Sequence, residues 1–398
     1  MTDLLIDPIT DPFPTDAPTG ADLLDTVRRF SAEIDGRADE GNTARAVPTD
    51  LIDRLRAHGL FRMALPRSLG GLELDLRSIV EVFEEVSRAD GSTGWTVLIG
   101  TSPMFFAWLD PEVATAMIGP EGDAMASSMF GPTGRAVPDG DGGLVLDGRW
   151  AFNSACVHAD WHVLGAMVMD GEAPRLRPDG RPDWRFVFVP HDQVEVVDTW
   201  DAGGLRATAS HDLVATGVRV PEAHTAMPMF DPARHPGPLW QLSFFGLLGP
   251  FMAAFPLGVA RRALDEFAAL AATKTRGGPG PTLAENDHVQ VRYGQAEAGL
   301  LAARAFLLAS VADLWETACR SEAATAEQEA TMSLAVQQSL RAAVEAVDFA
   351  YTTAGGGAAY THHPLQRCFR DIHTATQHLA FRDGNWTSMA AVRFGGRD

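Results

Sequence analysis

The segment YTHHPLQRCFRDIHTATQH, residues 360–378, is the most informative stretch of this chain. It is rich in histidine and arginine, and Pro364 precedes the helix that we predict in its second half. We predict a helix from about Gln366 to Val392. The residues just before Pro364 include no Asp or Glu, so a reaction that needs a carboxylate base at this place is disfavoured.

Long alanine-rich stretches with a helical period precede this segment. Helices are predicted at residues 250–273, 286–317 and 324–350. Long helices with short connections indicate a bundle. The stretch 239–260 has no charged residue, but Pro250 and Pro256 interrupt it. We interpret it as a helix buried on all sides rather than a membrane span.

The chain before the bundle changes pattern once. Residues 21–120 show helical spacing, whereas residues 124–220 contain alternating and valine-rich runs with Gly and Asp clusters between them. We therefore expect a mainly α fold with a central β domain. The expected parts are an N-terminal arm (1–20), an N-terminal helical domain (21–123), a middle β domain (124–230) and a C-terminal helical bundle (231–398).

Composition limits the partners. The formal net charge is -20, which disfavours nucleic acid and anionic membrane surfaces. Cys156, Cys319 and Cys368 fit neither a disulfide framework nor a CxxC metal site, and the acidic N-terminus lacks the features of a signal peptide. A cytoplasmic protein is predicted.

Common nucleotide and metal motifs are missing from the sequence. No GxGxxG follows a strand, and there is no P-loop or GxSxG motif. Gly355–Gly357 follows a helix and lacks the required spacing. His362 and His363 are adjacent, so their side chains point apart, and His158 stands in a strand-like run without a carboxylate at matching spacing. No metal site is predicted.

Four segments of this chain resemble flavin-dependent monooxygenases built on the acyl-CoA dehydrogenase fold. They are ADGSTGW (89–95), GRWAFNSACVHADW (148–161), GGLRATASHD (203–212) and the PLQRxxRDxH element (364–373) followed by His378. The segments run in the family's order across most of the chain. The resemblance implies an N-terminal helical domain, a middle β-barrel and a C-terminal four-helix bundle, assembled as a homotetramer or a homodimer.

The same resemblance implies a flavin cofactor, FMN or FAD. A flavin ring needs aromatic or apolar faces and hydrogen-bonding groups along its polar edge. The implied cofactor contacts are Trp95, Ser128, Phe130, Phe152, Asn153, Ser154, Arg276, Gly356 and His378. Arg276 stands where a loop arginine often reaches a cofactor phosphate across a subunit interface. His158, Trp161 and Phe245 are the candidates for substrate contact.

Dehydrogenases of this fold keep a glutamate at one of two positions, and both lack a carboxylate here. None occurs at residues 361–363, and none occurs between Asp231 and Asp265. A monooxygenase has other needs, because reduced flavin arrives from a separate reductase and O2 forms a C4a-hydroperoxyflavin. The resemblance implies that His378 donates a hydrogen bond or proton on the peroxide side and that Ser154 assists. His373 is a weaker candidate.

Ser102 stands where related monooxygenases often carry a histidine. A serine can donate a hydrogen bond but is a poor base at neutral pH. We include Ser102 among the catalytic candidates. A serine at this position disfavours a phenol substrate that the enzyme would have to deprotonate. The expected substrate is a small aromatic, heteroaromatic or natural-product intermediate.

Two other functions stay open from the sequence. One is a dehydrogenase or oxidase with a relocated base, and the other is a non-catalytic flavin or acyl-ligand binding protein of the same fold. Reduction of bound flavin by substrate without oxygen would favour the first. Intact flavin binding without either reaction would favour the second.

Overall fold

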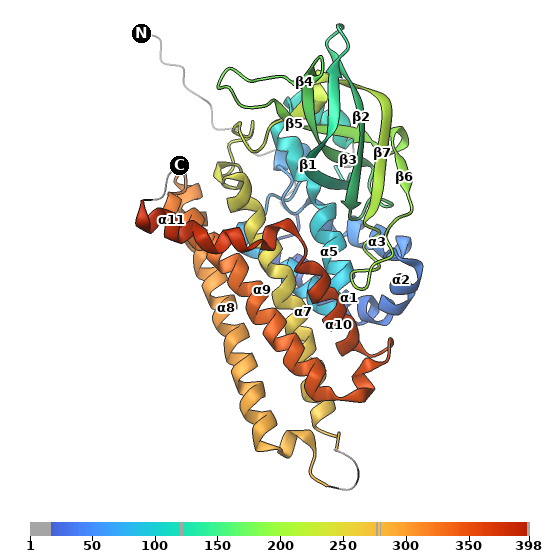
Figure 1. Ribbon diagram of the computed structural model, residues 1–398, viewed down its shortest axis with the longest axis vertical. Coiled ribbons are helices and arrows are strands. Elements are labelled where there is room, and N and C mark those ends of the chain that lie inside the picture. The colour runs from blue at the N-terminus through green and yellow to red at the C-terminus, as the bar shows by residue number, and fades with distance from the viewer. Residues whose placement is uncertain (1–16, 120–121, 276–277, 279, 396–398) are drawn as a thin grey trace.

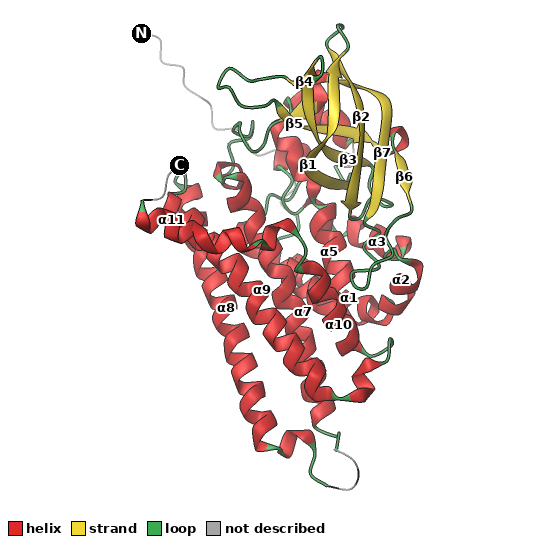
Figure 2. Cartoon of the chain, viewed as in Figure 1, coloured by secondary structure: helices red, strands yellow, loops and turns green. Residues whose placement is uncertain are grey.

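The computed structural model describes residues 17–119, 122–275, 278 and 280–395. A sheet lies at one end of the molecule, and three long helices run from it to the opposite end (Figures 1 and 2). These helices are α7 (Phe244–Ala271), α8 (Asp287–Cys319) and α9 (Ala326–Ala354). The order of helices, then strands, then helices confirms the predicted mainly α fold with a central β domain.

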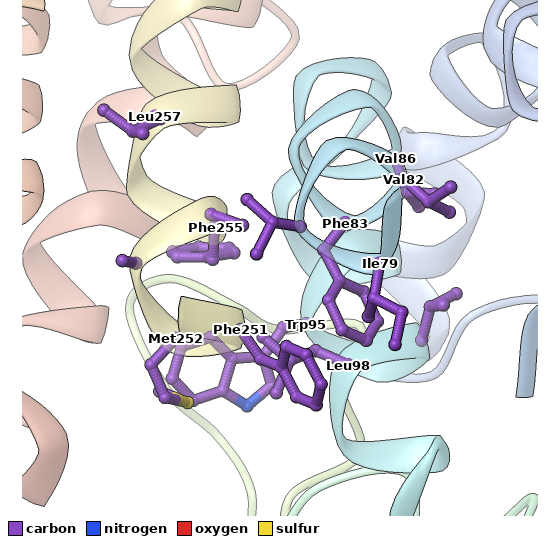
Figure 3. Packing of buried hydrophobic residues seen from close by; sticks show 14 of the residues in the cluster. Ile79, Val82, Phe83, Val86, Trp95, Leu98, Phe251, Met252, Phe255 and Leu257 are labelled. Atoms are coloured by element: carbon purple, nitrogen blue, oxygen red, sulfur yellow. The ribbon is translucent and has the colours of Figure 1, made fainter. Parts of the chain in front are cut away.

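Short helices form the N-terminal part. They are α1 (Gly20–Gly36), α2 (Ala38–Ala44), α3 (Thr49–Ala57), α4 (Leu76–Ala89), α5 (Gly91–Gly100) and α6 (Pro111–Ile118). The Asp90 carboxylate caps α5 by accepting from the backbone N–H of Thr93 at 2.8 Å. Phe83 of α4 and Trp95 of α5 both pack on α7, where Trp95 meets Phe255 with ring centroids 5.0 Å apart (Figure 3).

The strands form one sheet in the order β6-β7-β2-β1-β3-β5-β8, with β4 paired to β3. Their bounds are β1 (Ala126–Pro138), β2 (Gly143–Asn153), β3 (Trp161–Asp170), β4 (Ala173–Pro174), β5 (Trp184–Pro190), β6 (Glu195–Val197), β7 (His211–Pro221) and β8 (Thr225–Ala226). No ladder between described residues joins the edge strands β6 and β8. The domain is therefore a sheet with two edges rather than a barrel closed by hydrogen bonds.

A buried tryptophan fixes the middle of this sheet. Trp150 is fully buried and donates its indole N–H to the Gly165 carbonyl at 2.7 Å. A Cβ atom at Gly134 would lie 2.2 Å from its ring, so only glycine fits there. The register of β1 against β3 shifts between Met129 and Gly134. Such an irregularity re-aims nearby side chains, and Phe130 lies within it.

The bundle differs from the prediction at both ends. Helix α7 begins at Phe244 rather than near Pro250, because Ser243 accepts from the Gly246 N–H and caps the helix. The interpretation of residues 239–260 as a buried helix is confirmed for α7, whose most apolar window is 78% buried. Figure 1 shows α7 enclosed by its neighbours.

The predicted helix from Gln366 to Val392 is wrong. Helix α10 (Pro364–Ala375) ends early, and the described residues after it form two 3-10 turns and a short helix, α11 (Ser388–Phe394). The Thr376 hydroxyl donates to the His373 carbonyl at 2.6 Å, and the chain turns after it. Side-chain hydrogen bonds of this kind compete with helical ones. His373 and His378 therefore do not share one helix.

The loop before β7 docks tightly on α10, which gives a test of the fold. A Cβ atom at Gly204 would lie 2.1 Å from the Arg370 carbonyl oxygen, whereas one at Gly203 would meet nothing within 4 Å. We expect Gly204→Ala to lower the free energy of unfolding by about 1–3 kcal/mol through overpacking. Gly203→Ala is the matched control and should change it by less than about 0.5 kcal/mol. Equal effects in urea unfolding would refute this docking.

Candidate active site

Trp95, one turn into α5, begins a chain of buried polar side chains. Its indole N–H donates to Ser154 Oγ at 3.0 Å, and Ser154 Oγ lies 2.7 Å from Ser210 Oγ. Ser210 Oγ lies 2.6 Å from Thr208 Oγ1, which donates to the Leu205 carbonyl at 2.8 Å. Buried polar groups need such partners. This chain of hydroxyls joins a helix, the end of β2 and the loop before β7.

The two loops that carry these hydroxyls hold strained backbone. Phe152 and Ala155 have φ angles of 66° and 64°, and Leu205 and Ala209 have 51° and 46°. The Ala155 N–H donates to the Thr208 carbonyl at 2.8 Å, which ties the two loops together. Non-glycine residues in this region are held there by their surroundings and cluster at functional sites. The strained backbone and the buried hydroxyl groups therefore occur in the same two loops.

His378 lies beside Trp95 from the C-terminal segment. The two rings meet edge to face with centroids 5.3 Å apart. The side chain is open to solvent on one side, but the surrounding protein atoms displace water on the others and lower its pKa to about 4. Nδ1 accepts from the Ala380 N–H at 3.2 Å. At neutral pH the ring is therefore neutral with its hydrogen on Nε2, which makes it a hydrogen-bond donor.

A second pair of hydroxyls lies past the end of α5. Ser102 Oγ is 2.8 Å from Ser128 Oγ on β1 and 2.6 Å from the Ile99 carbonyl oxygen. Ser102 follows Trp95 by seven residues, about two helical turns, so this spacing places both on roughly the same side of the segment. Trp95 lies on α5 and Ser102 begins the 3-10 helix that follows it, so one continuous segment supports both polar groups.

Aromatic rings lie around Ser128. Phe130, two residues along β1, stacks on Phe186 with centroids 4.7 Å apart. Phe244, the first residue of α7, meets Phe130 edge to face at 5.3 Å. Its neighbour Phe245 is 61% exposed. Phe130, Phe186 and Phe244 therefore form an apolar cluster, and Phe245 beside it keeps an exposed aromatic face, the kind of surface that an aromatic ligand requires.

Phe152 and Asn153 end β2 just before Ser154. The Phe152 side chain is 68% exposed, although most large apolar side chains of the sheet are buried. Asn153 is fully buried, and its Oδ1 has no hydrogen-bond partner among the described residues. An open aromatic ring and an unpaired amide oxygen beside the hydroxyls fit a planar ligand with a polar edge, such as a flavin.

Two predicted substrate contacts lie against other elements. The His158 carbonyl accepts from Arg56 of α3 at 2.9 Å, and burial, helped by Arg56, lowers the pKa of its imidazole to about 4. Trp161 donates its indole N–H to the Met117 carbonyl of α6 at 3.0 Å. No described contact joins either side chain to Trp95, whereas Phe245 lies beside Phe244 in the aromatic cluster next to β1.

Two predicted cofactor contacts are separate from this site in one protomer. Gly356 lies in an exposed turn at the far end of α9, beside Lys274, whose ammonium donates to the Ala354 carbonyl at 2.5 Å. Arg276 lies outside the described residues. The end of α9, which precedes Gly356, lies at the end of the bundle away from the sheet (Figure 1).

The sequence analysis did not single out the charges that hold the site together. The Asp371 carboxylate, buried under the loop, accepts from the Leu205 N–H at 2.6 Å. Arg367 lies between acidic groups, with its Nε 3.3 Å from Asp90. Burial and the nearby Asp90 raise the pKa of Asp371 to about 7. These residues lie inside the motifs quoted from the sequence. Their role in holding the loop and α5 together becomes visible only when the fold brings them into contact.

The shifted pKa of Asp371 predicts a pH effect. Its folded-state pKa of about 7 lies above the ordinary value of 3.8 for an aspartate, so the folded protein binds this proton more tightly between those two pH values. Its contribution to stability is therefore largest below about pH 4 and declines as the pH rises to about 7. Asp371→Asn cannot titrate, so we expect its stability relative to wild type to improve from pH 5 to 7.

The measurement is urea unfolding of the variant and wild type at several pH values, with Asp170→Asn at an exposed position as control. A stability difference that stays constant with pH would show that Asp371 does not titrate in this range.

The site is not built for proton abstraction by a carboxylate. In the part of the chain that the structure describes, no Asp or Glu is hydrogen-bonded to Trp95, Ser154, Ser102 or His378. The available groups are hydroxyls, an indole N–H and a neutral imidazole. They can orient a ligand and stabilise charge that develops on oxygen.

Comparison with known proteins agrees with this geometry. Residues 18–109 match the family described as acyl-CoA dehydrogenase, N-terminal domain, and residues 251–383 match its C-terminal domain. Indole-3-acetate monooxygenase of Pseudomonas putida is 31% identical over 92% of this chain and 93% of its own length. The oxygenase component of an FADH(2)-dependent resorcinol hydroxylase from Rhizobium is 29% identical, covering 88% and 87%.

Solved structures show the same fold. The 3-HSA hydroxylase from Rhodococcus sp. RHA1 superimposes with a TM-score of 0.86 at 25% identity, over 96% of this chain and 98% of that one. XiaF from Streptomyces, solved with FADH2 and glycerol, has a TM-score of 0.86 at 24% identity, over 94% and 96%.

Fold and site together define a flavoprotein of the acyl-CoA dehydrogenase type that has lost the dehydrogenase base. The chain belongs to the flavin-dependent monooxygenases of the acyl-CoA dehydrogenase family. It is an oxygenase component that uses reduced flavin from a separate reductase together with O2.

Proposed function

We propose that this enzyme oxygenates a small aromatic or heteroaromatic compound bound between the Ser102–Ser128 pair and the rings of Phe130 and Phe245. One observation carries the proposal: the site combines hydroxyls with open aromatic faces and has no carboxylate in contact. The names of two relatives, acting on indole-3-acetate and resorcinol, support an aromatic substrate.

The proposed roles follow from the contacts. Bound reduced flavin supplies the electrons that activate O2. Trp95 holds Ser154 by its indole N–H, Ser154 presents a fixed hydrogen-bonding group to the flavin edge, and Phe152 covers part of the flavin's face. His378 donates a hydrogen bond from Nε2 and so stabilises negative charge on oxygen. Because its imidazole is already neutral, it does not have to lose a proton first. The phenylalanine cluster excludes water.

Ser102 narrows the substrate class further. It shares its hydroxyl with Ser128 and with a backbone carbonyl, so it holds a substrate by hydrogen bonding rather than by taking its proton. We infer a substrate that is reactive without deprotonation, such as an electron-rich heteroaromatic ring, in preference to a phenol that must become a phenolate.

The reaction can be tested with His378. Wild-type protein, a flavin reductase with NADH and a panel of indoles and phenols should give oxygenated product, with O2 consumed in proportion. His378→Ala should reduce the ratio of product to O2 consumed by roughly tenfold, since a hydrogen bond to a charged group is lost. Product is measured by mass spectrometry and O2 by an electrode.

His288→Ala, at an exposed position on α8, is the matched control. Full coupling in His378→Ala would remove His378 from the mechanism. Substrate-dependent reduction of flavin without O2 would instead indicate a dehydrogenase, and no turnover with any ring compound would reject the substrate class.

We also propose a homotetramer, or at least a homodimer, with α8 at the interface. This helix has a mean hydropathy of 1.5 in its most apolar window, of which only 33% is buried. Val291 and Leu301 are 59% and 56% exposed, and exposed alanines lie between and beyond them at helical spacing: Ala298, Ala302, Ala305, Ala309 and Ala312. A long apolar stripe on a water-soluble bundle is typical of a helix-packing interface.

The resemblance implies that Arg276 reaches a cofactor phosphate across a subunit interface, which requires such an assembly. Leu301→Glu should place a charge in the stripe and shift the protein to smaller species in sedimentation velocity. Leu176→Glu changes an equally exposed leucine on the β domain and should leave the mass unchanged. An intact oligomer in Leu301→Glu would exclude α8 as the interface.

We propose a cytoplasmic location. Cys156 and Cys368 are buried free thiols, and burial raises the pKa of each to about 12, so neither is poised to form a disulfide. A source of reduced flavin and NADH is also found in that compartment.

A further inference from the structure

The hydroxyl chain has a defined direction. A carbonyl oxygen can only accept, so the hydrogen of Thr208 Oγ1 goes to the Leu205 carbonyl. Ser210 must then donate to Thr208 and Ser154 must donate to Ser210. At the other end, the Trp95 indole can only donate, and it donates to Ser154. The direction of each bond follows from its neighbours.

This direction of the hydrogen bonds leaves one lone pair of the Ser154 hydroxyl oxygen without a partner in the chain of hydroxyls. Its hydrogen is used by Ser210, and one of its two lone pairs is used by Trp95, so only an acceptor lone pair remains for a ligand. A ligand group that donates a hydrogen bond fits this hydroxyl as it stands. A ligand group that only accepts would require the whole chain to reverse.

We propose that Thr208 and Ser210 are positioning residues that fix Ser154 as a hydrogen-bond acceptor and thereby make the site prefer reduced over oxidised flavin. The two oxidation states of flavin differ at N5. In reduced flavin N5 carries a hydrogen and can donate to Ser154, whereas in oxidised flavin N5 has only a lone pair and can only accept. The inference rests on the proposed placement of the flavin edge at Ser154. It explains how an oxygenase component can select the reduced form that its reductase supplies.

The size of the preference follows from what reversal loses. In the reversed chain Thr208 would donate to Ser210, and its bond to the Leu205 carbonyl would be lost. That carbonyl would still accept from the Trp200 indole at 2.9 Å, so it would not be left unpaired. One neutral hydrogen bond therefore separates the two directions, which corresponds to about threefold to tenfold in affinity.

The test measures the ratio of the dissociation constants of oxidised and reduced FMN, with the reduced form titrated under anaerobic conditions; FAD is measured in parallel. We expect the wild-type ratio to exceed one. Ser210→Ala removes the acceptor of the Ser154 hydrogen and frees that hydrogen for the ligand. Thr208→Val frees it by letting Ser210 donate back to Ser154. Both variants should lower the ratio by about threefold to tenfold.

Ser339→Ala is the matched control, because this buried serine donates to a helical carbonyl in α9, outside the hydroxyl chain. Equal weakening of both flavin forms in Ser210→Ala and Thr208→Val would mean a merely structural role, and an unchanged ratio would also refute the proposal. Ser154→Ala tests the proposed flavin position separately from the role of Thr208 and Ser210. If this variant changes the affinity for neither flavin form, the flavin edge does not lie at Ser154.

Discussion

The buried carboxylate of Asp371 links three parts of the chain that the fold must bring together. Asp371 holds the loop before β7 by its Leu205 N–H, and it lies against Gly91 at the start of α5, where a Cβ atom would come within 2.8 Å of its Oδ2. Arg367, one turn earlier on α10, balances the charge of Asp90. A buried carboxylate is costly unless it is hydrogen-bonded and compensated, so this arrangement tolerates few alternatives.

The catalytic geometry depends on that junction. Helix α5 carries Trp95, the loop before β7 carries Thr208 and Ser210, and α10 leads to His378. A shift of any one of these segments would change hydrogen bonds of 2.6–3.0 Å in the site. Because the segments come from the N-terminal, middle and C-terminal thirds of the chain, the site cannot form before the whole fold is complete.

The sequence predicts the structure best where the pattern is local or where a complete family motif is present. The order of helices and strands and the buried helix α7 could be predicted, whereas the roles of Trp95, Ser154 and Ser102 stay predictions. The break after α10 could not, because it depends on one hydroxyl of Thr376 competing with the helix. The direction of the hydroxyl chain could not either, since Thr208 and Ser210 meet Ser154 only through pairing of distant segments. Arg276 and Gly356 stay predictions.

The left-handed residues of the two loops have a consequence for comparing relatives. Glycine would adopt the backbone of Phe152, Ala155, Leu205 and Ala209 with less strain. A chain selected only for stability would therefore drift toward glycine at these places, whereas the present side chains keep the loops stiff. A relative with glycine at these positions would keep the same backbone course with less strain and with looser loops.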